Sequence, residues 1–440
     1  MTPRRPNKVL YYAAYLLVYP LLKLLFRLKV DRSGYQAASG PFIVLCNHES
    51  FMDFLLPTLA IFPHLLNAVA AQKFFYYRPL HILLPLLGCI PKKLFDSDMR
   101  TIAGILTVLK RGDNILLFVE GRCTTAGSYM GMHKATGKLL KKAGVPVISC
   151  RIEGAYTCMP FWRKGFRLGK VCLTVANLLS PDDLETLSVD EINERVDMRL
   201  SGRDALEGAG VCDGAGVLKS ADLVATKGAL RPGGTTKGKP LSTLFERRLI
   251  EGLENILYYC TNCGSEFTLT TKGNTIRCAN CNNTASLNRF ARLIAAPGSA
   301  VPATIQDWQR AQNLYELQHL GENMEPISVE VTVRVPADKP GRGMKPGGSG
   351  VLTFTPQGWS FEGEILQEPA SLFFPLKTVP ALTFDPNDNF QIYSGGVLYL
   401  FTPLDAQACA KYATLGECAY WRFMPEVQMT PGVNNGLIKR

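Results

Sequence analysis

A histidine and an aspartate at short spacing are the first residues whose types suggest acid–base chemistry. His48 and Asp53 lie five residues apart in the segment Asn47–Asp53, between the apolar run Phe42–Cys46 and a second apolar run that begins at Phe54. Along a regular helix this spacing separates two side chains by about 140°, so the pair can meet only if His48 lies in the turn before the helix. There the two residues would form a general base and its orienting partner. A helix-capping Asn or Ser beside a histidine with satisfied hydrogen bonds fits the same pattern.

Two further segments carry charged groups suited to an anionic substrate. Glu120, Gly121 and Arg122 follow one apolar run, and Lys92 and Lys93 come after another. Each segment is ordinary by itself, because Glu-Gly turns are common and adjacent lysines usually form a solvated surface. Together with the histidine and the aspartate they would supply a base, its partner, a flexible turn and several cations. This combination predicts a site for a phosphate-bearing substrate.

The segments around these residues alternate between strand-like and helix-like patterns. Apolar runs typical of buried strands are followed by segments with apolar residues three or four positions apart. We therefore predict an α/β domain over residues 31–205, in which the candidate residues lie on loops beyond strand ends. The expected strands are Phe42–Cys46, Ile115–Val119 and Val145–Ile152, and the expected helices are Thr101–Lys110, Lys134–Lys142 and a closing helix at Leu184–Leu200.

Four short motifs follow one another in this domain. They are Asn47-His48-x-Ser50-x-x-Asp53, Gly88–Lys93, Phe118-Val119-Glu120-Gly121 and Val145-Pro146-Val147-Ile148. In this order they resemble the four blocks of the glycerophospholipid acyltransferase superfamily, and most closely those of the bacterial 1-acyl-sn-glycerol-3-phosphate acyltransferases. The similarity covers most of residues 1–200.

The resemblance implies transfer of a fatty acyl group from a thioester, either acyl-CoA or acyl-carrier protein, to the hydroxyl of a lysophospholipid. The implied acceptor is 1-acyl-sn-glycerol-3-phosphate, and the product is phosphatidic acid. Neutral His48 would remove the hydroxyl proton while Asp53 holds the imidazole in the required tautomer, without a covalent intermediate. Backbone N–H groups near His48 or Gly121 would stabilise the oxyanion, and Glu120 would organise the acceptor.

The third motif departs from the family pattern at two positions. Val119 replaces a proline, which an extended strand tolerates. Arg122-Cys123-Thr124 stands where the family commonly has Thr-Arg-Ser, so the arginine expected at the acceptor's phosphate comes one residue early. Either Arg122 reaches the phosphate from a shifted turn, or a lysine takes its place. The candidate lysines are Lys73, Lys92 and Lys93.

Residues 1–30 predict a membrane-associating helix. They carry six basic residues and no acidic residue around an apolar stretch from Val9 to Leu22, which is interrupted by Pro20 and followed by Lys23. A spanning helix needs about 20 apolar residues, so we expect a helix that lies in one leaflet with its basic residues at the headgroups. A spanning helix and a cleaved signal peptide are the alternatives.

The composition favours an anionic partner in a reducing compartment. The chain of 440 residues has a formal net charge of +11 and a pI near 9.0, which suits a membrane surface with anionic lipid, a phosphate ester or nucleic acid. Its thirteen cysteines are odd in number and mostly scattered among apolar neighbours, which indicates free thiols. With the leader, these properties predict a peripheral or monotopic protein on the cytoplasmic face of the cell membrane.

A second specific pattern follows a glycine-rich linker or insertion predicted at residues 206–240. After a predicted helix at Leu241–Leu257, two pairs, Cys260-x-x-Cys263 and Cys278-x-x-Cys281, are separated by fourteen residues, which is close to the spacing of a zinc ribbon. Gly264 and Asn282 follow the pairs and tolerate the left-handed conformation of such knuckles. Four thiolates complete a tetrahedral shell, so we predict a structural Zn2+ within residues 241–290. A redox Cys-x-x-Cys pair is the alternative.

Residues 291–440 predict a β-rich domain that ends in a helix. A helix at Thr304–Leu320 precedes seven short strands, and the last helix is expected at Asp405–Trp421 with Asp405 as its cap. Such a series predicts a small barrel or sandwich, similar to a pleckstrin-homology domain, with a loop at Pro340–Gly348. A lipid-binding or regulatory module and a passive packing module are both compatible with it.

Two other functions compete with an enzyme. One is a membrane-associated protein that binds nucleic acid through the ribbon, but we do not expect this partner because the ribbon lacks a dense basic and aromatic patch. The other is a scaffold whose acyltransferase-like domain is inactive, an interpretation favoured by the shifted arginine.

Overall fold

The structure is a computed structural model. It describes residues 3–36, 40–94, 98–163, 165–204, 250–288, 291–405 and 407–424. The linker predicted at residues 206–240 and the first nine residues of the helix predicted from Leu241 lie outside these ranges.

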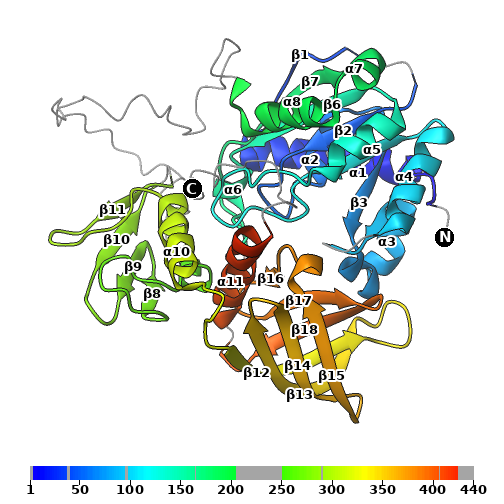
Figure 1. Cartoon of the computed structure of the whole chain (residues 1–440). Coiled ribbons are helices and arrows are strands. Elements are labelled where there is room, and N and C mark those ends of the chain that lie inside the picture. The colour runs from blue at the N-terminus through cyan, green and yellow to red at the C-terminus, as the bar shows by residue number, and fades with distance from the viewer. Residues whose placement is uncertain are drawn as a thin grey trace, which may run out of the picture.

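The N-terminal domain is built on a seven-stranded sheet with the order β1-β7-β6-β2-β5-β3-β4 (Figure 1). Neighbouring strands are parallel except for β6 and β7, which are antiparallel. The strands are β1 Lys29–Gly34, β2 Ile43–Cys46, β3 Leu66–Ala71, β4 Ile90–Lys92, β5 Asn114–Phe118, β6 Val147–Glu153 and β7 Cys172–Leu179. The helices are α1 Lys8–Phe26, α2 Leu55–Ala60, η1 Gln72–Tyr76, α3 Leu80–Leu86, α4 Met99–Lys110, α5 Ala135–Ala143, α6 Ala155–Cys158, α7 Pro181–Thr186 and α8 Val189–Ser201.

Both faces of this sheet are buried, because alternate residues of its strands point to opposite sides. Val44 and Cys46 of β2 pack in one core with apolar residues of α1 and α2. Ile43 and Leu45 pack in a second core with residues of α4, α5, α7 and α8. The domain is therefore an α/β layer structure, as its alternating pattern predicts.

Helix α1 packs against the domain along one half of its circumference. Tyr11, Leu22 and Phe26 are buried, and the hydroxyl of Tyr11 donates a hydrogen bond to the carbonyl of Leu66 at 2.6 Å. The opposite half exposes large apolar side chains, namely Val9, Tyr12, Leu16, Leu17, Leu21 and Leu24. Among the described residues, α1 is the one helix whose length and composition would allow it to cross a membrane.

Two predicted helices differ from the observed elements. The closing helix expected at Leu184–Leu200 is two helices, because Ser188 forms a capping box with Glu191 and starts α8 where α7 has just ended. Residues 250–257 of the helix expected to end at Leu257 form turns and the short helix η3 Leu253–Asn255. Gly252, with a φ of 96°, breaks regular helical geometry there.

The cysteine pairs lie in a module with a small antiparallel sheet and one long helix. The sheet has the order β11-β10-β9-β8, and its strands are β8 Leu269–Lys272, β9 Thr275–Cys278, β10 Thr284–Leu287 and β11 Leu293–Ala295. Helix α10, Ile305–His319, begins after its cap Thr304, as predicted. The side-chain oxygen of Gln312 in α10 accepts the backbone N–H groups of Tyr258 at 2.9 Å and Tyr259 at 3.3 Å, which ties the helix to the first cysteine knuckle.

The C-terminal module is an antiparallel sheet of seven strands with the order β15-β14-β13-β12-β18-β17-β16. Its elements are β12 Ile327–Pro336, β13 Met344–Thr355, β14 Gly358–Ile365, β15 Glu368–Pro375, η4 Leu376–Thr378, β16 Thr383–Asp385, β17 Asn389–Ser394, β18 Val397–Pro403 and α11 Ala408–Phe423. The loop predicted at Pro340–Gly348 is shorter than expected, since β13 begins at Met344. The N-cap of α11 is Gln407, and Asp405 accepts the N–H of Gln407 instead of capping the helix itself.

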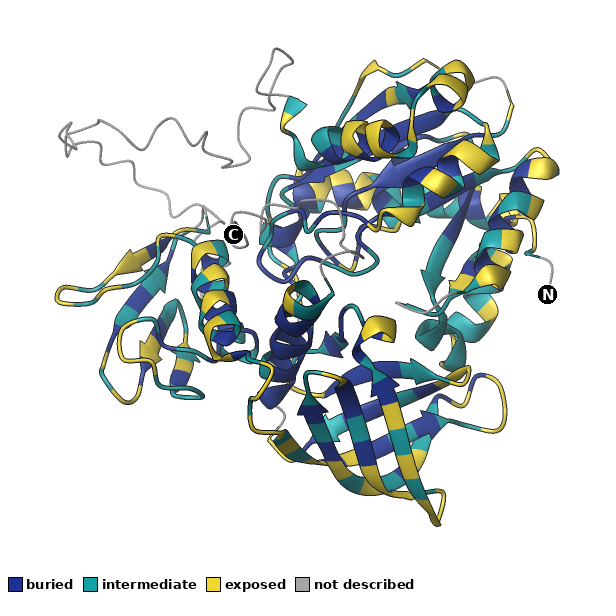
Figure 2. Cartoon of the chain, in the orientation of Figure 1, coloured by how far each residue is buried: buried dark blue, intermediate teal, exposed yellow. Residues whose placement is uncertain are grey.

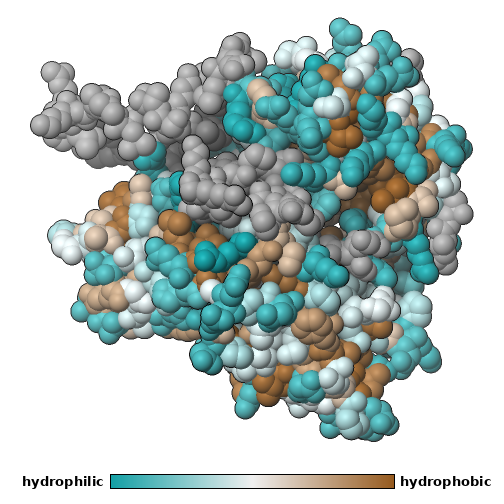
Figure 3. Space-filling model, viewed as in Figure 1, coloured by the Kyte–Doolittle hydropathy of each residue, from teal (hydrophilic) through white to brown (hydrophobic). Residues whose placement is uncertain are grey.

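Helix α11 occupies the centre of the molecule. It lies between the cysteine module, the C-terminal sheet and the N-terminal domain (Figure 1), and most of its residues are buried (Figure 2). On the face shown in Figure 3, hydrophobic patches on the domains are interrupted by hydrophilic side chains. The three parts of the chain thus pack around one buried helix.

Candidate active site

Residues predicted to do chemistry meet at one edge of the N-terminal sheet. His48 follows β2, Glu120 follows β5, Lys73 follows β3 and Lys92 ends β4. These four strands are parallel neighbours, so their carboxyl ends share one edge, where α/β domains place their ligands. The topology therefore brings together segments that are far apart in the sequence.

The imidazole of His48 is paired with a buried carboxylate. Its Nδ1 lies 3.1 Å from Oδ2 of Asp53, whose side chain has no exposed surface. Asp53 also accepts the backbone N–H of Ser50 at 2.8 Å and its hydroxyl at 2.7 Å. These bonds fix the carboxylate in the turn before α2, and the carboxylate in turn orients the ring. With 19% of its side chain exposed, His48 remains accessible.

Glu120 and Thr124 clamp the loop after β5 onto the backbone of His48. One carboxylate oxygen of Glu120 accepts the N–H of His48 at 2.6 Å, and the other accepts the N–H of Met130 at 2.8 Å. Thr124 donates its own N–H to the carbonyl of His48 at 2.8 Å. Burial raises the pKa of Glu120 to about 8, although the two N–H donors oppose the shift. In this conformation Glu120 organises the protein loops around the base.

Asn47 and Glu49 have structural roles in the site that were not predicted for them. The side-chain amide of Asn47 donates to the carbonyl of Ile152 at 2.8 Å and accepts its N–H at 2.7 Å, which ties the end of β2 to β6. Glu49 accepts the N–H of Tyr156 at 3.1 Å. Burial, followed by the nearby charge of Asp53, raises the pKa of Glu49 to about 8. Both residues are sequence neighbours of His48, and this position is what could have indicated that they help to hold the imidazole in place.

The predicted substrate-binding cations are not all directed to one point. Arg122 donates to Glu417 in α11 at 2.5 Å and to the carbonyl of Leu382 at 3.4 Å. The ammonium of Lys73 lies 2.8 Å from Asp385 in β16.

Lys92 and Lys93 lie beside one another at the end of β4. The ammonium of Lys92 donates to the carbonyl of Lys93 at 3.3 Å, and the backbone N–H of Lys93 donates to Asp98 at 3.3 Å.

The backbone N–H of Gly121, predicted as an oxyanion donor, donates to the carbonyl of Phe118 at 3.3 Å. The N–H groups of His48 and Gly121 themselves are therefore engaged within the protein, since the N–H of His48 donates to Glu120.

Cys123 contacts the imidazole, a neighbour that the sequence analysis did not assign. Its sulfur lies 3.6 Å from Nδ1 and 3.4 Å from Nε2 of His48. Because the two ring nitrogens point in diverging directions, a sulfur nearly equidistant from both lies off the axis of either one. The contact is therefore packing beside the ring and not a directed hydrogen bond. The sequence offered one indication of this difference, because Cys123 occupies the position at which the family commonly has arginine.

Opposing effects act on the proton affinity of His48. Burial lowers the pKa of the imidazole, but its interaction with Cys123, followed by its hydrogen bond to Asp53 and the charge of that carboxylate, raises it, and the net pKa lies well above the usual 6.5. The imidazolium is thus favoured by its surroundings. A reaction that uses His48 as a base requires the neutral ring, so the base becomes available as the pH rises through this elevated pKa.

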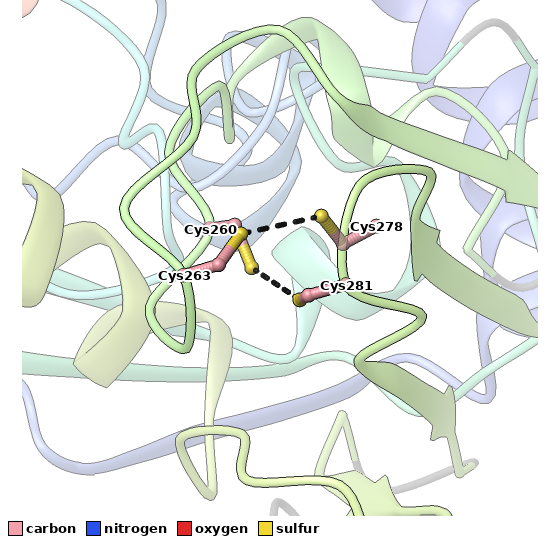
Figure 4. Close-up of side chains that lie close together, drawn as sticks. All are labelled: Cys260, Cys263, Cys278 and Cys281. Carbon is pink, nitrogen blue, oxygen red and sulfur yellow. Dashed lines mark hydrogen bonds between the residues drawn. The ribbon is translucent and has the colours of Figure 1, made fainter.

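The four predicted metal ligands converge on one point (Figure 4). The sulfur atoms of Cys260, Cys263, Cys278 and Cys281 all lie within 4.8 Å of one another. Gly264 and Asn282, which follow the two pairs, have φ values of 74° and 62°. The left-handed conformation predicted for these knuckle positions is therefore observed, and the cluster can hold a metal ion.

The N-terminal domain is similar to known proteins in two comparisons. Residues 27–153 match the family model described as acyltransferase. A crystal structure of the 1-acyl-sn-glycerophosphate (LPA) acyltransferase PlsC from Thermotoga maritima is similar at 22% identity and a TM-score of 0.40, over 46% of this chain and 81% of that chain. The residues that match the family model lie in the N-terminal domain and make up less than half of the chain.

We predict that replacing Cys123 by alanine lowers the pKa of His48, because the interaction with this sulfur is the largest of the effects that raise the pKa of the imidazole. An NMR titration of the imidazole C–H signals measures this pKa, and the spectrum of His48→Gln identifies the signal. Cys89→Ala is the matched control, since Cys89 is a free thiol that is not among the groups acting on the pKa of His48. An unchanged pKa in Cys123→Ala would refute the electrostatic role of this sulfur.

Proposed function

We propose, from the premise that residues 27–153 form a domain of the acyltransferase superfamily, that this chain transfers a fatty acyl group from a thioester to the hydroxyl of a lysophospholipid. The observation that carries the proposal is the pairing of His48 with the buried Asp53 at the carboxyl edge of the sheet. A neutral imidazole held in one tautomer by a carboxylate is suited to remove a proton from an alcohol.

The residues support a direct transfer. Asp53 holds the proton on Nδ1 of His48, so Nε2 accepts the proton of the acceptor hydroxyl as its oxygen attacks the thioester carbonyl. The C–O bond forms, the C–S bond of the tetrahedral intermediate breaks, and the imidazolium returns its proton to the departing thiolate. Asp53 stabilises the imidazolium between these steps. No residue needs to carry the acyl group.

We propose 1-acyl-sn-glycerol-3-phosphate as the acceptor and acyl-CoA or acyl-carrier protein as the donor. Cations come from the strand ends at this edge of the sheet: Lys73 and Arg122 follow β3 and β5, and Lys92 and Lys93 lie at the end of β4. Such groups suit the phosphate of the acceptor. The product would then be phosphatidic acid.

The outward half of α1 supports attachment to a membrane with anionic lipid. Leu16 and Leu17 expose 69% and 75% of their surface, and basic residues precede the helix and occupy its last turn. A helix whose inner half is held by protein and whose outer half is apolar suits insertion into one leaflet. We propose a peripheral or monotopic enzyme on the cytoplasmic face of the cell membrane.

The cysteine cluster supports a structural zinc ion. A tetrahedral Zn2+ with bonds of about 2.3 Å separates its sulfur ligands by about 3.8 Å. The distances from Cys260 to Cys281 and from Cys263 to Cys278 are 3.7 Å and 3.8 Å. Four cysteine ligands leave no position for a reacting water, so the ion would hold the two knuckles together.

The sheet order and final helix of the C-terminal module are compatible with a pleckstrin-homology-like fold, and we propose a regulatory role for this module.

An inactive scaffold is the second candidate function of the chain, and it is favoured by the pairing of Arg122 with Glu417 in place of a free cation. Activity measurements distinguish the two.

We predict that His48→Ala abolishes acyl transfer, with a loss of at least about a thousandfold, because the acceptor hydroxyl loses its base. Labelled acyl-CoA and acyl-carrier protein, tested against a panel of lysophospholipids, measure the transfer. His319→Ala, on α10, is the control and should retain activity. His48→Ala should also remain bound to vesicles. Near-normal turnover in His48→Ala would refute the catalytic assignment, and no turnover in the unmodified chain would favour the scaffold.

We predict that the double substitution Leu16→Asp and Leu17→Asp weakens binding to vesicles of phosphatidylcholine and phosphatidylglycerol by at least about tenfold, because two charges would enter the apolar layer. Vesicle co-sedimentation measures the binding. Leu404→Asp is the control, since Leu404 is equally exposed at 73% but lies in the C-terminal module. Equal binding by the double variant and the unmodified chain would contradict attachment through α1.

We predict one zinc ion per chain in freshly purified protein. Cys281→Ser should lose the ion and lower the thermal unfolding midpoint of the cysteine module, because metal binding contributes to folding. Cys158→Ser changes a free thiol outside the cluster and should retain the ion. Elemental analysis counts the metal, and a content well below one per unmodified chain would overturn the prediction.

A further inference from the structure

The C-terminal module touches the catalytic edge through two ion pairs that come from different elements. Glu417 of α11 pairs with Arg122 in the loop after β5, and Asp385 of β16 pairs with Lys73 after β3. Arg122 is the residue directly before Cys123, which contacts the catalytic imidazole. Two of the cations available for an acceptor phosphate are thus bound by carboxylates of another module.

Backbone and aromatic contacts hold the module in this position. The N–H of Gly343 donates to the carbonyl of Tyr76 at 2.6 Å, and Arg342 forms a β-bridge with Tyr77. The rings of Phe161 and Phe384 meet edge to face at 5.3 Å. The two ion pairs are therefore part of a continuous contact between the module and the catalytic edge.

The pair between Arg122 and Glu417 is better shielded from water than the pair between Arg334 and Asp388 of the same module. Their side chains are 12% and 20% exposed, whereas those of Arg334 and Asp388 are 35% and 51% exposed. Charges that are shielded from water interact more strongly, and a cation with reduced hydration needs an anion. Either a protein carboxylate or a phosphate of the substrate can satisfy this need at Arg122.

We propose that Glu417 and Asp385 act as internal counter-anions, which the phosphate of an anionic acceptor must replace at Arg122 and Lys73. This inference rests on the proposed function and adds a mechanism of regulation to it. The module is autoinhibitory: its carboxylates and the acceptor phosphate compete for the same two cations. A neutral acceptor has no group with which to compete.

We call the two ion pairs, Arg122–Glu417 and Lys73–Asp385, the latch. The surroundings of α11 suit this role. Lys411, nearer the start of the helix, pairs with Glu266 in the first cysteine knuckle, and Cys418 donates to the carbonyl of Asn313 in α10. Helix α11, which carries Glu417, is therefore also anchored to the cysteine module. Removal of the carboxylate of Glu417 alone leaves these anchors in place.

Steady-state transfer from labelled acyl-CoA tests the proposal with two acceptors, 1-acyl-sn-glycerol-3-phosphate and a monoacylglycerol of the same chain length. We expect Glu417→Gln and Asp385→Asn each to lower the KM for the phosphate-bearing acceptor by about fivefold to tenfold. The KM for the neutral acceptor should not change. Asp388→Asn removes a carboxylate of the same module that pairs with Arg334 and is the matched control; it should change neither KM. A pair that serves only to hold the module would produce an unchanged or raised KM, which overturns the proposal.

Binding measured without turnover separates this inference from the proposed function. In the His48→Ala background, calorimetry should show tighter binding of 1-acyl-sn-glycerol-3-phosphate when Glu417→Gln is added. Tighter binding supports the latch even if no chain transfers acyl groups, which would refute only the proposed function. Equal, weaker or undetectable binding overturns the latch. Asp385 is 44% exposed, so Asp385→Asn carries the test if Glu417→Gln does not fold.

Discussion

A carboxylate sealed from water sets the geometry on which the site depends. An ionised group without exposed surface is costly unless charge and hydrogen bonds compensate it, and Asp53 finds this compensation in Ser50 and His48. The three bonds close the turn between β2 and α2 and leave the imidazole one orientation. Because Asn47 joins the same turn to β6, the position of the base is tied to the packing of the sheet.

Motifs and elements that depend on a local pattern could be predicted from the sequence. Contacts between the N-terminal domain and the C-terminal module could not. His48, Asp53 and the two cysteine pairs could be found because each group lies within a few residues of its partners or in a recognisable spacing. The partner of Arg122 could not be found, since Glu417 is 295 residues away and no periodicity links the two. The break between α7 and α8 was missed for a different reason. Apolar spacing continues across it, but Ser188 satisfies the first N–H groups of a new helix.

The cysteine module has a clear place in the packing although the sequence offered no reason for it. Its knuckles and α10 present polar groups to one another, through Gln312 and through the bond from Tyr258 to Glu316 at 2.7 Å. Helix α10 then packs against α11, whose Tyr412 meets Trp359 of the C-terminal sheet with ring centres 6.0 Å apart. The module therefore supports the helix that carries Glu417. A cluster of four cysteines that can hold a metal ion suits this task, because a small sheet of four strands has little core of its own.

The proposed competition between carboxylates and an acceptor phosphate gives a physical reason for acidic residues at this edge of a basic protein. An acceptor phosphate needs several cations, yet cations held close together in a partly dehydrated site repel one another and destabilise the folded chain. Carboxylates supplied by a separate module relieve this repulsion while the site is empty. They also set a threshold, because a ligand must bind the cations more favourably than Glu417 and Asp385 do. In the proposed competition these acids come from α11 and β16, and not from the loops that carry His48 and Asp53. The same residues would then stabilise the resting state and yield to a phosphate without disturbing the bond between His48 and Asp53.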